Sequence, residues 1–238
     1  MRRKKGGIIL LAMILLLAGG SAAYVGDYYH ADAAAAEALA SDSSVGVEQT
    51  GFGWYFDGPS GEKALIFYPG GKVEETAYAP LLHRLAAAGV DVFLVKVPLR
   101  LAFTAIGKAD EVMDEYHYEH WYVGGHSLGG VAASFYAAEH SGALDGVVLL
   151  GAYSTKMLSG KLKTILVYGS EDGVLNLKEY MKNRANAGRS AVEVVIEGGN
   201  HAQFGSYGAQ KGDGEALIPA EEQIEETVQA IVEMTGGQ

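Results

Sequence analysis

The 238-residue chain contains no cysteine. Disulfide bonds, thiolate nucleophiles, cysteine-ligated metals and a lipidated N-terminal cysteine are therefore excluded. The same absence removes any information about the redox compartment. The localisation of the protein has to be inferred from its N-terminus instead.

Basic residues are also scarce, with 18 Lys and Arg against 29 Asp and Glu and a net charge of -11. Four of the basic residues lie within the first five positions, so the rest of the chain carries -15. A domain with this much negative charge repels a polyanion. The composition therefore argues against nucleic acid as a partner.

The basic start is followed by 21 residues without a charge, 6–26, with the densest apolar run at 8–18. That length is about enough to span a bilayer, while the small residues at 19–23 suit signal peptidase. We predict that 1–26 is a cleaved signal peptide or an uncleaved membrane anchor. The anchor is favoured because no folded-domain pattern follows at once. Either alternative places the remainder outside the cytoplasm, tethered to the membrane or secreted.

Residues 27–50 combine an alanine-rich stretch with a serine-rich one, a composition typical of a linker. We predict a stalk here that is helical in part and otherwise flexible. From Gly51 the pattern changes, which predicts a single catalytic domain over 51–238.

Short apolar runs alternate with helical periodicity throughout that domain. The predicted strands are Gly53–Phe56, Ala64–Tyr68, Val90–Val97, Trp121–Gly124, Gly146–Leu150, Thr164–Tyr168 and Val192–Ile196. The predicted helices are Thr76–Ala88, Thr104–Tyr116, Leu128–His140, Asn176–Ala187 and Ala220–Met234. Continuously apolar strands that alternate with helices predict an α/β fold, a mostly parallel sheet flanked by helices.

Gly125-His126-Ser127-Leu128-Gly129 matches the pattern G-x-S-x-G, in which a serine lies on a strained turn between a strand and a helix. The hydroxyl of such a serine is exposed above the sheet, where it can act as a nucleophile. A glycine-rich loop with an incidental serine is the alternative for this pentapeptide alone. The residues that follow the other strands decide between the two.

A serine hydroxyl needs a base in contact and an acid that orients the base. Ligands bind beyond the carboxyl ends of parallel strands, so we searched the residues after each strand. Asp172 follows one strand and His201 follows the last, in the chain order Ser, Asp, His of α/β-hydrolases. Glu171 is the alternative acid.

Two backbone amides are candidates for an oxyanion hole. The Leu128 amide lies at the start of the helix after Ser127, where the helix dipole favours negative charge. Gly70-Gly71 follows another strand, and the Gly71 amide is the second candidate, with the Lys72 amide as a substitute. A simple tight turn at Gly70-Gly71 is the alternative.

Four segments together resemble the α/β-hydrolase superfamily, and within it the small membrane-tethered bacterial α/β-hydrolases. They are Tyr68-Pro69-Gly70-Gly71-Lys72, Gly125-His126-Ser127-Leu128-Gly129-Gly130, Tyr168-Gly169-Ser170-Glu171-Asp172-Gly173 and Gly198-Gly199-Asn200-His201-Ala202-Gln203-Phe204-Gly205. The resemblance covers roughly 52–234. It implies a serine hydrolase with Ser127, Asp172 and His201 in the matching positions, and it implies no particular substrate.

The connection at 151–163 is too short for the lid domain of larger members of the superfamily. An open site suits small esters or the exposed end of a larger molecule. We therefore expect carboxylic ester hydrolysis, with amide or peptide cleavage, acyl transfer and a non-catalytic surface binding module as alternatives. No cofactor is implied, and no residues have the spacing of metal ligands. The glycine-rich stretch 204–214 borders the substrate site or is an ordinary surface loop.

Overall fold

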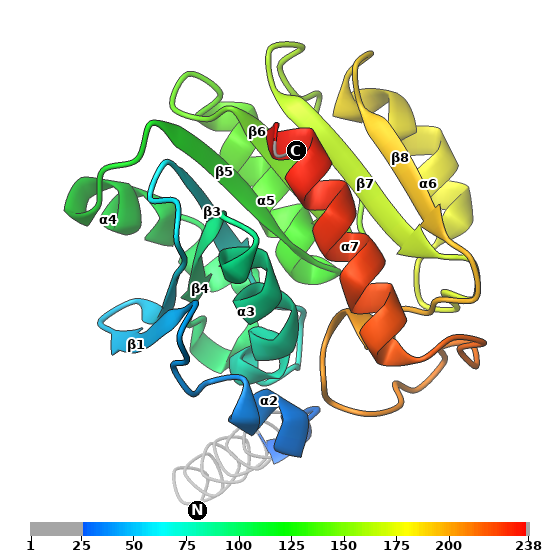
Figure 1. Ribbon diagram of the computed structural model, residues 1–238. Coiled ribbons are helices and arrows are strands. Elements are labelled where there is room, and N and C mark those ends of the chain that lie inside the picture. The colour runs from blue at the N-terminus through cyan, green and yellow to red at the C-terminus, as the bar shows by residue number, and fades with distance from the viewer. Residues whose placement is uncertain (1–25, 237–238) are drawn as a thin grey trace, which may run out of the picture.

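The computed structural model describes residues 26–236, and these form an eight-stranded sheet between helices (Figure 1). Along the sheet the strand order is β1-β2-β4-β3-β5-β6-β7-β8. The strands are β1 (Gly46–Thr50), β2 (Gly53–Asp57), β3 (Lys63–Tyr68), β4 (Asp91–Val95), β5 (His120–His126), β6 (Gly146–Leu150), β7 (Lys163–Gly169) and β8 (Val192–Ile196).

The six strands from β4 to β8 in this order are parallel, and only β1 and β2 pair in the antiparallel sense. Every residue of β4 and β6 is buried, as expected for strands that are covered on both faces. The carboxyl ends of the parallel strands therefore meet at one edge of the sheet, which we call the carboxyl edge.

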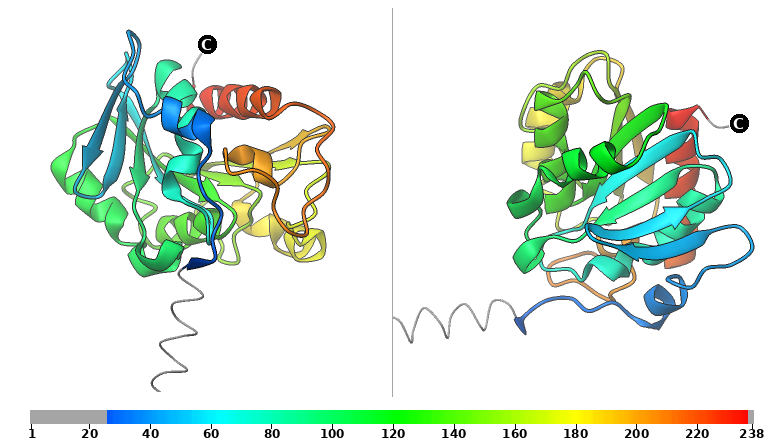
Figure 2. Two further views of the ribbon diagram at one scale, coloured as in Figure 1. Left: turned by 90° about the horizontal axis from the view of Figure 1, so that it is seen from below. Right: turned by 90° about the vertical axis from the view of Figure 1, so that its left-hand side faces the viewer.

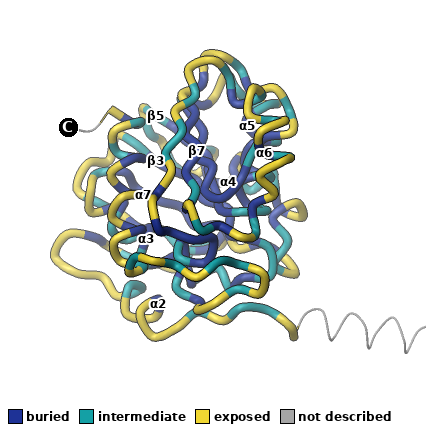
Figure 3. Tube along the Cα trace, turned by 90° about the vertical axis from the view of Figure 1, so that its right-hand side faces the viewer, coloured by how far each residue is buried: buried dark blue, intermediate teal, exposed yellow. Residues whose placement is uncertain are grey.

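Helices cover both faces of the sheet. They are α2 (Ala33–Glu37), α3 (Ala79–Ala87), α4 (Lys108–Glu115), α5 (Leu128–Glu139), α6 (Leu177–Asn183) and α7 (Ala220–Thr235), with short 3-10 turns η1 (Glu75–Tyr78), η2 (Pro98–Arg100), η3 (Ala102–Ala105), η4 (Arg184–Ala187) and η5 (Ala202–Phe204). Buried side chains of α3 and α7 pack on one face, whereas those of α4, α5 and α6 pack on the other. Figure 3 shows the buried parts of the chain in the middle of the fold.

The seven predicted strands and five predicted helices are present, which confirms the predicted α/β fold. Three predicted helices, those at 76–88, 104–116 and 176–187, are each divided into a 3-10 turn and an α-helix. The segment 104–116 is interrupted at Gly107, which lies at the N-cap of α4, so η3 ends before α4 begins.

The segment 27–50, predicted as a stalk that is helical in part and otherwise flexible, contains the helix α2, but the rest of it is packed on the domain. Residues 46–50 form the edge strand β1, and Asp32 caps α2 by accepting a hydrogen bond from the Ala35 amide at 3.1 Å. A small side chain (Ala35) and a β-branched one (Val45) are buried and pack against the domain here. The packed fold therefore begins well before residue 51.

The uncharged run at 6–26 lies almost wholly outside the described residues. Within 26–236, no helix combines the length and the apolar character that crossing a bilayer requires.

Candidate functional site

Ser127 lies on the turn between β5 and α5, with φ 53° and ψ -123°. Left-handed φ values are uncommon for residues other than glycine and are found where a fold imposes strain. The neighbouring glycines allow this turn, because a Cβ at Gly129 would lie 2.1 Å from the Tyr68 carbonyl oxygen. A Cβ at Gly125 would lie 2.5 Å from the same oxygen. The turn therefore requires glycine at both positions.

His201 and Asp172 form a buried pair at the ends of β8 and β7. The His201 Nδ1 lies 2.8 Å from the Asp172 Oδ2, and each side chain is only 1% exposed. The second oxygen of Asp172 accepts hydrogen bonds from the Val174 and Leu175 amides at 3.0 and 2.7 Å. These bonds fix the carboxylate toward the imidazole.

Glu171, the alternative acid, lies beside Asp172 but faces elsewhere. Its carboxylate accepts a hydrogen bond from the Ser170 hydroxyl at 3.1 Å, and its side chain is partly exposed. The geometry therefore pairs His201 with Asp172.

Ser127 and His201 line the same surface hollow, which has a volume of about 240 Å³. The other lining residues are Leu128, Val131, Gly151, Ala152, Tyr153, Val174, Leu175 and Asn176. Within residues 26–236 the buried His201 Nε2 has no hydrogen-bond partner. With Nδ1 donating to Asp172, this nitrogen is the basic one.

The two candidate oxyanion donors lie next to each other. Leu128 is the first residue of α5, and an amide at this position has no acceptor inside its own helix. A Cβ at Gly71 would lie 3.0 Å from the Leu128 Cδ2, so the Gly71 backbone packs directly against Leu128. The Lys72 amide instead donates to the Arg100 carbonyl at 3.1 Å and is occupied.

Tyr78 and His126 hold the glycine-rich loop in place. The buried Tyr78 hydroxyl accepts a hydrogen bond from the Gly70 amide at 3.0 Å and lies 2.8 Å from the His126 Nδ1, to which it donates. Burial, with a smaller contribution from His201, keeps the pKa of His126 well below its usual value of 6.5. The neutral ring packs against the His201 ring, with 4.3 Å between the centroids.

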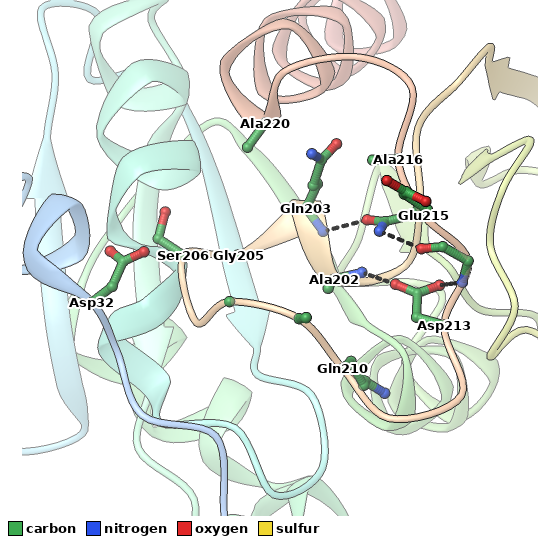
Figure 4. A pocket seen from close by; sticks show the side chains of 14 residues that line it. Asp32, Ala202, Gln203, Gly205, Ser206, Gln210, Asp213, Glu215, Ala216 and Ala220 are labelled. Carbon is green, nitrogen blue, oxygen red and sulfur yellow. Dashed lines mark hydrogen bonds between the residues drawn. The ribbon is translucent and has the colours of Figure 1, made fainter.

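Asp213 connects the loop after His201 to the turn that carries Asp172, a role that the sequence analysis did not identify. Its Oδ1 accepts hydrogen bonds from the amides of Gly173 and His201 at 3.1 and 3.2 Å. Its Oδ2 accepts one from the Ala202 amide at 2.8 Å (Figure 4). The only sequence signal was its place in the polar stretch 204–214.

The same stretch borders a larger pocket of about 570 Å³, between Asp32 and Asp213 (Figure 4). Backbone, amide and carboxylate groups line it. Asn200 stabilises this region, because its amide nitrogen donates to the Gly214 carbonyl at 2.9 Å and its backbone exchanges hydrogen bonds with the Gln223 side chain. The stretch 204–214 is thus part of the framework behind His201.

The connection between β6 and β7 covers 151–162 and contains no helix. It leaves the hollow beside Ser127 without a lid domain. Of the other histidines, His83 and His120 lie near the carboxylates of Asp42 and Asp145, and His140 stacks on Tyr136. Within 26–236, no three His, Asp or Glu side chains are grouped to hold a metal ion.

Comparison with known proteins gives a family match. A family model described as the alpha/beta hydrolase family matches residues 64–225, which is more than half of the chain. No curated protein matches the sequence.

Solved structures with the same fold are distant in sequence. A dienelactone hydrolase from Anabaena variabilis is 15% identical with a TM-score of 0.59, covering 81% of this chain and 97% of that one. A putative hydrolase from Agrobacterium vitis is 13% identical with a TM-score of 0.60, covering 80% and 98%. Est1E from Butyrivibrio proteoclasticus is 12% identical with a TM-score of 0.54, covering 81% and 99%. These likenesses show the fold.

Proposed function

The chain belongs to the alpha/beta hydrolase family, which supports a hydrolytic activity, and on this premise we propose that it is a serine esterase. In this proposal Ser127 is the nucleophile, His201 the general base and Asp172 the acid that orients the base. The substrate is a carboxylic ester.

One observation carries the proposal. The buried His201 imidazole is fixed by Asp172 at 2.8 Å, and its other nitrogen has no protein partner among the described residues, in the hollow that Ser127 also lines. A buried polar atom without a partner is unfavourable unless the site uses it. A role of this His201 nitrogen as the proton acceptor for the Ser127 hydroxyl accounts for its lack of a partner.

In the first half of the reaction, the Ser127 Oγ attacks the ester carbonyl carbon and the His201 Nε2 takes the hydroxyl proton. Asp172 stabilises the imidazolium that forms. The Leu128 and Gly71 amides donate hydrogen bonds to the oxyanion of the tetrahedral intermediate. When this intermediate collapses, the alcohol leaves with the proton from His201 and an acyl-enzyme remains.

In the second half, His201 takes a proton from water, and the resulting hydroxide attacks the acyl carbonyl. The second tetrahedral intermediate expels the Ser127 oxygen, which regains its proton from His201, and the carboxylic acid is released. Within 26–236 the short connection at 151–162 forms no lid over the hollow, and the walls of the hollow are apolar at Val131, Val174 and Leu175. The hollow suits a small acyl group or the exposed end of a larger ester.

Labelling with a fluorophosphonate probe tests the activated serine. We expect the full chain in detergent to be labelled, and Ser127→Ala to lose labelling completely. His201→Ala and Asp172→Asn should label at least about a hundredfold more slowly, while Glu171→Gln serves as the matched control and labels normally. A folded wild-type chain that does not react would overturn the mechanism and favour a non-catalytic binding module.

Matched ester and amide substrates separate esterase from peptidase or amidase. The proposal expects saturable ester turnover with no amide turnover. Amide cleavage at a comparable kcat/KM would replace the esterase assignment by a peptidase, and acyl transfer to an added alcohol would indicate a transferase.

We also propose that the domain acts outside the cytoplasm, attached to the membrane through 6–26. The support is the basic start of the chain and the uncharged run that follows it. The N-terminal mass of the protein purified from cell membranes tests this, since signal cleavage would remove the run.

A further inference from the structure

The segment 27–32, which we call the strap, joins the two loops that hold the proposed site. The backbone of Tyr29 pairs with Val73, just after the Gly70-Gly71 loop. Its amide donates to the Lys72 carbonyl at 2.8 Å, and its carbonyl accepts from the Glu74 amide at 2.9 Å. On the other side, the Tyr29 hydroxyl accepts a hydrogen bond from the Lys211 amide at 3.0 Å.

Both ends of the strap are fixed as well. At its start, Asp27 forms an ion pair with Lys72 at 2.5 Å. At its end, the Asp32 amide donates to the Ser206 carbonyl at 2.9 Å. The chain is therefore held against the domain from its first residue after the uncharged run 6–26, and no flexible stalk separates the two.

The strap lies at the carboxyl edge of the sheet, where Ser127 also lies. Its hydrogen-bond and ion-pair partners in the loops follow the ends of β3 or β8. In Figure 1 the arrowhead of β7 points to the lower side of the molecule, where the blue residues before α2 lie, and Figure 2 shows these residues from two other sides. The proposed site and the exit of the uncharged run thus share one edge.

The loop after β4, at this same edge, exposes two apolar side chains and is strained at Leu99. Leu99 is 55% exposed and has a left-handed φ of 55°, and Phe103 is 42% exposed. A bulky residue in this conformation is strained, and such strain collects at functional segments. Water is an unfavourable environment for these side chains, whereas a bilayer interface is a favourable one.

Basic side chains surround this loop in an otherwise acidic chain. Lys96, Arg100 and Lys108 line a groove of about 460 Å³ together with Glu74 and Glu75, and Lys108 is held there by an ion pair with Glu111. The Arg100 guanidinium lies 3.2 Å from the ring centroid of Tyr28 in the strap. Basic groups next to exposed apolar ones are the composition that binds anionic lipid headgroups.

We propose that the carboxyl edge rests on the membrane and that the substrate is an ester carried by a lipid of that membrane. This inference rests on the proposed esterase function. The strap fixes Asp27, the residue that follows the run 6–26, against Lys72 beside the Gly70-Gly71 loop. If that run is the proposed anchor, the domain cannot turn its site toward bulk solvent. The ester carbonyl of a lipid lies at the headgroup boundary, where an open hollow reaches it without a lid.

The test uses the full chain in vesicles of phosphatidylglycerol and phosphatidylethanolamine, with three esters. They are p-nitrophenyl acetate, a fluorogenic phospholipid ester in the same bilayer and a fluorogenic ester bound to a large dextran. The comparison variant carries a 20-residue Gly-Ser linker between Gly26 and Asp27. It leaves the strap intact but gives the domain a reach of about 25 Å.

We expect both proteins to cleave p-nitrophenyl acetate equally. Relative to that rate, the wild type should cleave the lipid ester and hardly act on the dextran ester, and the linker should raise the dextran rate at least about tenfold. Equal dextran rates for the two proteins, no turnover of the lipid ester, or a mature chain that begins near residue 27 would each overturn the proposal. Failure of all three esters, with no fluorophosphonate labelling, would instead remove the esterase function on which it rests.

A second pair of variants tests the exposed loop. The double variant Leu99→Ser, Phe103→Ser should lower the ratio of lipid-ester to p-nitrophenyl acetate turnover at least about fivefold. Val192→Ser is the matched control, since Val192 is 51% exposed at the start of β8, on the opposite edge of the sheet. An unchanged ratio in the double variant would contradict membrane contact by this loop.

Discussion

Asp213 shows how one side chain can position two residues of the proposed triad through backbone amides alone. Its carboxylate accepts from the amides of Gly173, His201, Ala202 and Gly214, so it fixes the turn of the acid relative to the loop of the base. Hydrogen bonds from amides to a carboxylate are stronger than hydrogen bonds between neutral groups, so the four together hold these loops firmly.

Replacing Asp213 by alanine removes both acceptor oxygens, so the distance between His201 and Asp172 is less tightly fixed. We expect kcat for an ester to fall about 10- to 100-fold with little change in KM, and the free energy of unfolding to fall by about 1–3 kcal/mol. Steady-state kinetics and urea unfolding measure both. Asp213→Asn, which keeps one acceptor oxygen, should be intermediate; a KM effect alone would contradict a positioning role.

His126 makes the stability of the protein sensitive to pH. Its pKa is depressed in the folded state and normal in the unfolded chain, so the unfolded chain binds more protons as the pH falls below about 6.5. The stabilisation is thus present above that pH and is lost in acid, at up to about 1.4 kcal/mol per pH unit.

Urea unfolding at pH 7.5, 6.5 and 5.5 measures this loss. His126→Gln retains an acceptor for the Tyr78 hydroxyl but does not titrate, so its free energy of unfolding should fall less with acid. Subtracting the two curves cancels the other titrating groups. Parallel curves for the two proteins would show that His126 does not titrate differently on unfolding.

Among the elements, the packing of α5 on β3 sets the position of the nucleophile. Gly129 lies so close to the Tyr68 backbone that a methyl group cannot be accommodated without moving the helix. Gly129→Ala should therefore lower the free energy of unfolding by at least about 2 kcal/mol and abolish labelling of Ser127. Gly142→Ala, with no atom within 4 Å of the added Cβ, should leave both unchanged. Normal labelling of Gly129→Ala would contradict this account of the turn.

The elements predicted from the sequence were those with a continuous apolar pattern. β6 matches its predicted bounds because burial on both faces selects apolar residues along the whole strand. β8 also matches its bounds, although it is the last strand of the sheet and only Ile196 is fully buried, because its sequence VEVVI is rich in β-branched residues. β1 has the sequence GVEQT with mostly exposed side chains, and α2 has only five residues. Neither carries a period that a sequence can reveal, since tertiary contacts hold them in place.

In the candidate site, too, some residues could be predicted from the sequence and others could not. Ser127, Asp172 and His201 follow three strands, so the topology of a parallel sheet was enough to place them at one edge. Asp213 and Tyr78 act through backbone amides that are distant in the sequence, and no residue pattern encodes such contacts. The choice between Asp172 and Glu171 also needed the structure, because both follow β7.

At the scale of the molecule, the packed segment 27–50 belongs to the folded domain and contributes to its stability. A chain that starts at Gly51 would expose the surface that Val45 and Ala35 cover and would lose all pairing to β2 from β1. Burial of Val45 alone contributes about 1.5–3 kcal/mol. We expect the 51–238 fragment to melt at least about 5 °C below the 27–238 fragment, measured by circular dichroism. Equal melting temperatures would mean that 27–50 adds no stability.

The order of groups along the chain also decides when chemistry can begin during synthesis. Ser127, Asp172 and His201 arrive in turn. The His201 amide donates to Asp213, and the preceding residue, Asn200, is bonded through its backbone to Gln223 of α7, close to the C-terminus. A growing chain that has just extruded Ser127 has a hydroxyl but no partner to deprotonate it. Under the proposed function, unfinished chains are therefore inert toward esters, and hydrolysis starts only after the last helix has folded against the sheet.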